Sequence, residues 1–140
     1  MWLIYALLSA LFAALVAIFA KLGLKTVDST LVTIIRAVIM AGFLVVFGAA
    51  TNKFSNFSFT SLGNRDWGLV LLSGIAGAVS WLFYFLALKL GLASKVSAVD
   101  RLSLVFVIIL AGLFLGEKLT AKTILGALLM VLGAALISLK

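Results

Sequence analysis

The sequence predicts an all-α, polytopic membrane protein with five transmembrane helices. Of its 140 residues, 66% are hydrophobic and only 11% are charged, and the mean hydropathy is +1.38. A soluble domain carries roughly 25% charged residues because its surface faces water. The apolar residues also gather into five runs, each close to the roughly 20 helical residues that cross a ~30 Å hydrocarbon core. Strands of a membrane barrel would alternate polar and apolar residues, and these runs do not.

The five runs define the helices expected in a single domain, residues 1–140. We expect these helices at about 2–21, 29–50, 66–89, 96–116 and 121–139. Asp28 and Thr120 precede the second and the fifth, and both are residue types that favour a helix N-cap. Three phenylalanines among Ser and Asn follow the second helix and fit either a segment at the lipid headgroups or a mobile loop. They are Phe54, Phe57 and Phe59.

The composition excludes several classes of function. The chain has no cysteine and no histidine, so disulfides, thiol chemistry and His-based metal sites are excluded. It also has no P-loop and no pair of acids at catalytic spacing, so we expect neither an enzyme nor a cofactor. Because the basic residues flank apolar runs, we expect them to contact membrane lipid headgroups rather than nucleic acid. The first run has no preceding positive charge, which favours a membrane helix over a signal peptide.

Basic residues are nearly balanced between the two sides of the membrane. Four lie on the N-terminal side and five on the other, too small a difference to fix one orientation by the positive-inside rule. The sequence therefore predicts dual topology. Counting Arg36 and Arg101 with the second side gives four against seven instead, and an N-terminus that faces out. The two sets are Lys53, Arg65, Lys118 and Lys122, and Lys21, Lys25, Lys89, Lys95 and Lys140.

Two opposite charges inside predicted helices are the first candidates for a functional site. A charge near the bilayer centre costs roughly 2.5–3.5 kcal/mol and is a functional candidate by default. Arg36 lies ~10 Å into the second helix and Asp100 about five residues into the fourth, so the two can pair at similar depth. The alternatives are snorkelling for Arg36, which we also expect of Arg101, and a capping box of Ser97 with Asp100.

Aromatic and small residues share one face of the third helix. Gly74 and Ala78 suit close helix approach. Beyond them an aromatic wall fits a small-molecule cavity, to which Ser80 and Ser97 can add hydrogen bonds. A packed core or an interfacial aromatic belt fits the same pattern. The wall is Trp81, Tyr84 and Phe85.

Small residues also recur on the first and fifth helices, where they favour close packing within the chain or between two chains. On the first helix they recur every fourth residue, and on the fifth they lie seven apart. They are Ser9, Ala13 and Ala17, and Gly126 and Gly133.

Several stretches together resemble the EamA-type domain of the drug/metabolite transporter superfamily, in its single-repeat, five-helix bacterial and archaeal branch. The most specific is Leu115–Thr120, Leu-Gly-Glu-Lys-Leu-Thr, in which we expect Glu117 and Thr120 to be structural and to cap the next helix. One departure is Ala98, where the family often has proline, and this argues against a broken helix there. The other stretches are Tyr5–Ala14, Lys21–Lys25, Ala93–Ser103 and Leu125–Leu129.

The resemblance implies one half of a ten-helix, inverted-repeat transporter. A chain with one repeat would pair with an inverted copy of itself, and the Gly126 face resembles the dimer contact of small multidrug transporters. Those relatives carry a coupling glutamate in their first helix. This chain has no acid there, so Asp100 is the candidate proton carrier.

The predicted function is ion-coupled transport of a small metabolite or amphipathic compound by an antiparallel homodimer in a bacterial or archaeal cell membrane. A lipid-carrier flippase subunit, holding phosphate with Lys89, Lys95 and Arg101, is the first alternative. The second is a non-transporting partner or assembly subunit.

Overall fold

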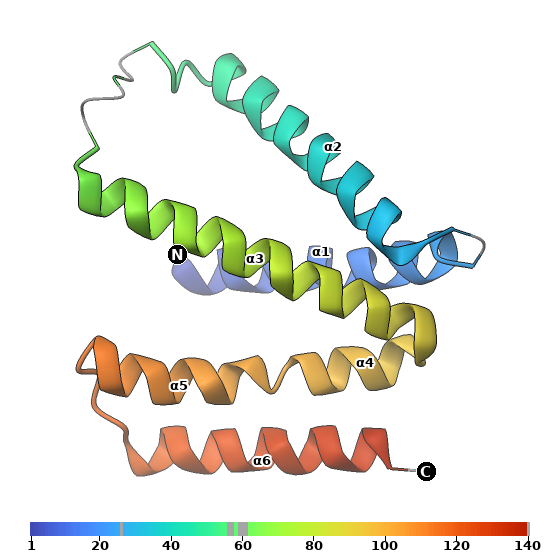
Figure 1. Cartoon of the computed structure of the whole chain (residues 1–140). Coiled ribbons are helices and arrows are strands. Elements are labelled where there is room, and N and C mark those ends of the chain that lie inside the picture. Colours follow the sequence, from blue (N-terminus) through green and yellow to red (C-terminus); the bar gives the residue numbers. More distant parts are fainter. Residues whose placement is uncertain (26, 56–57, 59–61, 140) are drawn as a thin grey trace. The chain divides into compact units, whose positions relative to one another are not determined.

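The structure, a computed structural model, describes residues 1–25, 27–55, 58 and 62–139. In these residues it is all-helical, and five segments are long and apolar enough to cross a membrane, as the sequence predicts. The helices are α1 (Trp2–Gly23), α2 (Ser29–Ala50), α3 (Asn64–Leu90), α4 (Ala93–Asp100), α5 (Ser103–Phe114) and α6 (Ala121–Ser138). Helices α4 and α5 together form the fourth span (Figure 1).

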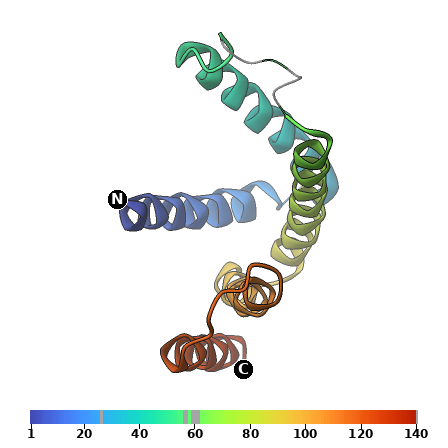
Figure 2. The ribbon, with the colours of Figure 1, turned by 90° about the vertical axis from the view of Figure 1, so that its left-hand side faces the viewer.

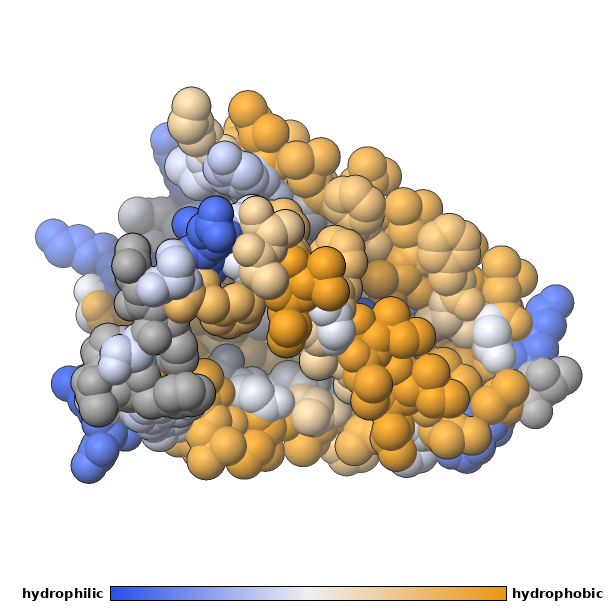
Figure 3. Space-filling view, turned by 90° about the horizontal axis from the view of Figure 1, so that it is seen from above, coloured by the Kyte–Doolittle hydropathy of each residue, from blue (hydrophilic) through white to orange (hydrophobic). Residues whose placement is uncertain are grey.

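The surface of the chain is apolar over most of its area, as a lipid-facing protein requires. Large side chains that a soluble protein would bury are exposed on all five spans, for example Phe43, Phe83 and Phe106. Figure 3 shows apolar residues over most of the visible face, as expected of helices whose sides meet lipid.

The chain divides into two compact units, and each is described on its own. The first unit comprises residues 1–21 and 90–140, with α4 and α5 packed against α6. Lysines tie its helix ends together, because Lys21 donates to the Gly91 carbonyl at 2.7 Å and Lys95 to the Ser138 carbonyl at 3.0 Å. In Figures 1 and 2, α6 runs back alongside α4 and α5.

The second unit comprises residues 22–89, with α2 and α3 as its helices. The Asp28 carboxylate caps α2 by accepting from Thr30 N–H at 2.9 Å and Leu31 N–H at 3.1 Å. Lys89 donates to the Val27 carbonyl at 3.2 Å and so joins the end of α3 to the start of α2. The two helices are close at that end and diverge toward Ala50 and Asn64 (Figure 1).

The end of α2 is closed by a turn in which Asn52 has a φ of +53°. Phe54 folds back over this end, and its ring lies so close to Gly48 that a Cβ there would meet it at 2.8 Å. Of the three phenylalanines predicted to lie at the headgroups or in a loop, Phe57 and Phe59 are outside the described residues.

Candidate functional site

A cavity of about 610 Å³ lies between α2 and α3. This volume is within the range of small-molecule sites in proteins. Its wall is mostly apolar, and the polar groups on it are few. Residues of both helices contribute, among them Thr33, Arg36, Met40, Ser73, Gly77 and Trp81.

The Arg36 guanidinium is held over aromatic rings at the edge of this cavity. Its Cζ lies 3.6 Å from the centroid of the Trp81 ring and 5.4 Å from that of Phe85. A cation over a tryptophan face is stabilised by about 0.5–1 kcal/mol when exposed and by about 2 kcal/mol or more when desolvated. Trp81, the nearer ring, is half-buried like Arg36, and the more distant Phe85 is 1% exposed.

Tyr84 completes the aromatic group without lining the cavity. Its ring meets Trp81 edge-on with centroids 5.9 Å apart, and Phe85 at 6.2 Å. Such edge contacts between rings are worth about 0.5–1.5 kcal/mol beyond burial. Tyr84 therefore packs against Trp81 and Phe85 and is not part of the cavity wall.

Carboxylates do not neutralise Arg36 among the described residues of this unit, because both acids bind backbone amides. Asp28 caps α2, and Asp66 accepts from Gly63 N–H at 3.1 Å. Aromatic faces thus offset a charge that lies about 10 Å into α2, at 1.5 Å per residue. The predicted partner Asp100 belongs to the other unit, and its pairing with Arg36 stays a prediction.

Sequence reasoning missed two polar residues of the cavity wall and included two serines, Ser80 and Ser97, that are not on it. Thr33 is 7% exposed, and its hydroxyl donates to the Ser29 carbonyl at 2.7 Å. Ser73 faces the cavity from α3, whereas Ser80 is not part of the wall. The i, i+3 spacing of Thr33 and Arg36 is the signal that would have found Thr33.

Asp100 is the last residue of α4, because the fourth span breaks at Arg101 and Leu102. The helix begins at Ala93, three residues earlier than expected, so the predicted first-turn capping box of Ser97 with Asp100 is wrong. The prediction that Ala98, in place of proline, argues against a broken helix is also wrong, because the helix breaks without proline. The Leu102 N–H bonds the Val99 carbonyl at 2.9 Å, three residues back, and this tightens the turn without proline.

The break places charge close to the middle of the span. The span covers Ala93–Phe114, 22 residues, with its midpoint between Ser103 and Leu104. At 1.5 Å per residue, Asp100 and Arg101 lie about 5 and 4 Å from that midpoint. Discontinuous helices at this depth form the substrate and ion sites of many transporters.

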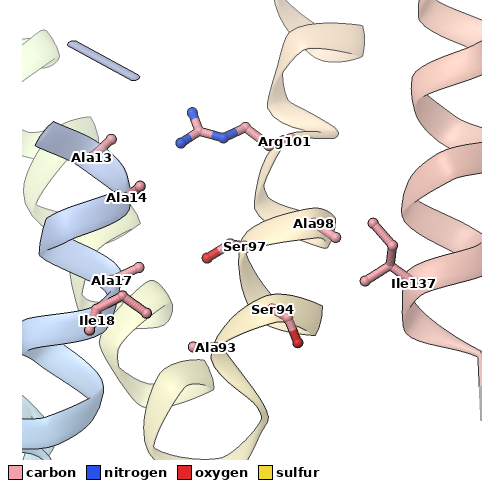
Figure 4. A pocket seen from close by; sticks show the side chains of 10 residues that line it. All are labelled: Ala13, Ala14, Ala17, Ile18, Ala93, Ser94, Ser97, Ala98, Arg101 and Ile137. Atoms are coloured by element: carbon pink, nitrogen blue, oxygen red, sulfur yellow. The ribbon is translucent and has the colours of Figure 1, made fainter. Parts of the chain in front are cut away.

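A second cavity, of about 450 Å³, lies within the first unit between α1 and α4 and reaches α6 at Ile137. Figure 4 shows Ser97 and Arg101 directed from α4 toward the α1 wall, where Ala13, Ala14 and Ala17 lie. The sequence predicted that Arg101 snorkels or, in the flippase alternative, holds phosphate; the structure places it on the wall of this cavity. Asp100 lines neither cavity.

The comparisons with known proteins identify the family. A model of the EamA-like transporter family matches residues 1–139. The chain belongs to this family. An uncharacterized transporter in the cobO 3' region of Sinorhizobium sp is 44% identical over 137 residues, 98% of this chain and 96% of that protein. The uncharacterized transporter YvbV of Bacillus subtilis (strain 168) is 31% identical over 135 residues, 96% of this chain but 44% of YvbV. No solved structure matches.

The predicted resemblance is therefore confirmed, and this EamA-like chain is a multi-pass membrane transporter. Membership of this family implies a lipid environment and a small-molecule substrate. The family and the names of both relatives indicate transport rather than enzyme activity.

The glycines predicted to pack closely are open within this EamA-like chain, and their use in a contact between two chains stays a prediction. A Cβ added at Gly74, Gly126 or Gly133 would meet nothing within 4 Å. Gly74 and Ala78 line the α2–α3 cavity instead of a tight helix contact. On α1, Ala13 and Ala17 line the second cavity, whereas Ser9 is exposed.

The Leu-Gly-Glu-Lys-Leu-Thr signature shapes the turn between α5 and α6. Thr120 is the N-cap of α6, and its hydroxyl accepts from Thr123 N–H at 3.2 Å. Gly116 has a φ of +67°, the left-handed conformation common just after a helix. Glu117 contributes its main chain, since its N–H donates to the Ala111 carbonyl at 3.2 Å. No contact of its carboxylate supports the predicted cap in this described turn.

Two of the three bases in the phosphate-holding alternative bind the backbone. Lys89 donates to Val27 and Lys95 to Ser138 and Leu139. Only Arg101 of that set faces a cavity.

Proposed function

We propose that this chain is an ion-coupled secondary transporter of a small metabolite or amphipathic compound, and that the α2–α3 cavity holds the substrate. The observation that carries the proposal is the Arg36 guanidinium over Trp81 at the wall of that cavity. An apolar pocket with few polar groups suits a small ligand, and a fixed cation gives it orientation.

Asp100 is the proposed coupling acid. It lies beside a helix break about 5 Å from the middle of its span, at 1.5 Å per residue. An ionisable group at this depth is a candidate for a proton relay. Its pairing with Arg36 in one state of the cycle would give alternating access a switchable contact.

The proposed working unit is an antiparallel homodimer in a bacterial or archaeal cell membrane. The nearly equal number of bases on the two sides supports insertion in both orientations. The chain spans 44% of YvbV, so one relative has more than twice this span in a single chain. Two copies of this chain would supply a comparable number of helices.

Proton movement in proteoliposomes tests the transport proposal. We would trap pyranine inside and add an amino-acid mixture, as small metabolites, or ethidium, as an amphipathic cation. We expect at least one probe to move protons, and Asp100→Asn to abolish that movement while Glu117→Gln, in the exposed α5–α6 loop, preserves it. Unchanged coupling in Asp100→Asn would exclude Asp100, and silence with both probes would count against transport of these classes.

Cysteine crosslinking tests the dimer, and the natural chain offers no background because it has no cysteine. Gly126→Cys and Gly133→Cys enter open space, so neither should disturb the fold. In an antiparallel pair, a disulfide should join position 126 of one chain to 133 of the other in native membranes. Crosslinks of 126 to 126 and 133 to 133 alone would indicate a parallel pair and contradict the proposal.

A further inference from the structure

The cavity between α1 and α4 combines an apolar wall with a cation near mid-span. Three alanines of α1 form one side, and Ser97 of α4 and Arg101, just after α4, face them (Figure 4). At about 450 Å³ it has room for a small ligand or for the head and first carbons of a larger one. Its chemistry is therefore that of an amphipathic molecule with one polar end.

The charge of Arg101 is not balanced within this cavity. No carboxylate is among the described residues that line it. Asp100, the residue before Arg101 and the last of α4, does not line this cavity. An arginine near the bilayer centre is costly unless it is paired or hydrated. The cavity thus lacks the anion that would balance its cation.

We propose that this cavity binds the oxoanion group of an amphipathic ligand, with Arg101 as the binding cation and the alanines of α1 beside the apolar part. The planar guanidinium presents paired N–H donors that match the two oxygens of a carboxylate or phosphate. The Ser97 hydroxyl, one turn before Arg101, is a second polar group on the same wall. The oxoanion is either a lipid headgroup or a soluble amphiphile, and the test separates these sources.

The test uses the full-length chain in nanodiscs with one cysteine, Ala14→Cys, on the wall opposite Arg101. We would compare its reaction rates with anionic sulfonatoethyl and cationic trimethylammonium-ethyl methanethiosulfonate. A fixed charge in a low-dielectric cleft raises the local concentration of opposite charge at least about tenfold. We expect the anionic-to-cationic rate ratio to fall about tenfold in Arg101→Gln.

Two control variants distinguish loss of the Arg101 site from a folding defect. Arg101→Lys retains the charge and should retain the ratio, and Lys122→Gln removes a charge that does not line the cavity. An equal fall in Lys122→Gln, or no fall in Arg101→Gln, would overturn the proposal.

Protection of the cysteine identifies the source of the oxoanion. Octanoate should slow labelling in phosphatidylcholine nanodiscs if the ligand is soluble. Added phosphatidylglycerol should slow it if the ligand is a headgroup. Protection by neither overturns the proposal, even where the ratio depends on Arg101. The assay needs no flux, so its outcome is independent of the transport proposal.

Discussion

The two units of the molecule each place one arginine on a cavity wall, and the two guanidinium groups have different surroundings. Arg36 lies over the rings of Trp81 and Phe85. Arg101 faces alanines and has no aromatic ring or carboxylate among the residues that line its cavity. The same residue type is thus stabilised by the protein in one unit and left available in the other.

This difference separates two ways to keep a charge in a membrane. Aromatic faces lower the cost of the Arg36 charge, so in the proposed substrate site this charge is held without a bound ligand. In the further inference proposed above, the charge of Arg101 is balanced by a bound oxoanion instead, because no described residue that lines its cavity is aromatic or acidic. The surroundings of Arg36 suit a site that a substrate enters and leaves, and those of Arg101 suit a site in which an anion stays bound.

The largest effect should come from removing the ring under Arg36. Trp81→Ala should destabilise the chain by about 0.5–2 kcal/mol from the lost cation–π contact, because both partners are half-buried, and by a further amount from lost packing. In Arg36→Gln the same substitution should cost clearly less, because the contact is already gone. The measurement is a double-mutant cycle from detergent unfolding followed by circular dichroism. Additive costs would show that Trp81 contributes only its packing, and the contrast with Arg101 would fail.

Filling the α2–α3 cavity should stop transport without unfolding the chain. Gly77 lines this cavity, and a Cβ added there would meet nothing within 4 Å, so Gly77→Leu enters open space. Gly42→Leu on α2 is the matched control, since Gly42 is equally open but not on the wall. We expect at least about tenfold lower probe-coupled proton movement in Gly77→Leu, equal to ~1.4 kcal/mol. Ala13→Leu, on the wall of the α1–α4 cavity, should leave this movement unchanged, and an equal loss in both variants would contradict the assignment of the substrate to the α2–α3 cavity.

Much of the fold follows from the sequence because the membrane leaves few choices. Apolar runs of about 20 residues can only be helices there, and this fixed the five spans. Asp28 and Thr120 were also identifiable as N-caps from their residue type and position. These features depend on local chemistry alone.

The break in the fourth span could not be predicted from the sequence, because no single residue causes it. Proline and glycine are the usual signals, and neither lies at Arg101 or Leu102. The tightened turn comes from main-chain hydrogen bonds that local residue types do not encode.

The site was predictable in part. The helical spacing of Trp81 and Phe85 placed them on one face, but whether glycines beside them pack or open a cavity depends on the angle between two helices. Composition cannot give that angle.

The smallest expected effect is the difference in how acid changes the stability that the helix caps of the two units provide. The N–H of Leu31, followed by that of Thr30 and the charge of Lys89, holds the pKa of the Asp28 carboxyl below the usual 3.8. Because the pKa is lower in the folded state, the cap stabilises the fold fully when the pH is above the pKa of Asp28 in the unfolded chain. This stabilisation is lost as the pH falls through the pKa of the folded chain. Thr120 caps α6 with a hydroxyl, which does not titrate.

Unfolding between pH 6 and 2 should therefore separate the caps. Thr120→Ala should cost about 1 kcal/mol at every pH. Asn at position 28 keeps an oxygen that can accept the cap hydrogen bonds but carries no charge. Asp28→Asn should therefore lower the free energy of unfolding little below pH ~3, where the Asp28 carboxyl is also neutral, and most near neutral pH, where that carboxyl is ionised. Helix content in detergent micelles, measured by circular dichroism during denaturant unfolding, provides the comparison. A Thr120→Ala cost that changes with pH, or an Asp28→Asn cost that does not, would show that the start of α2 is held by contacts other than its cap.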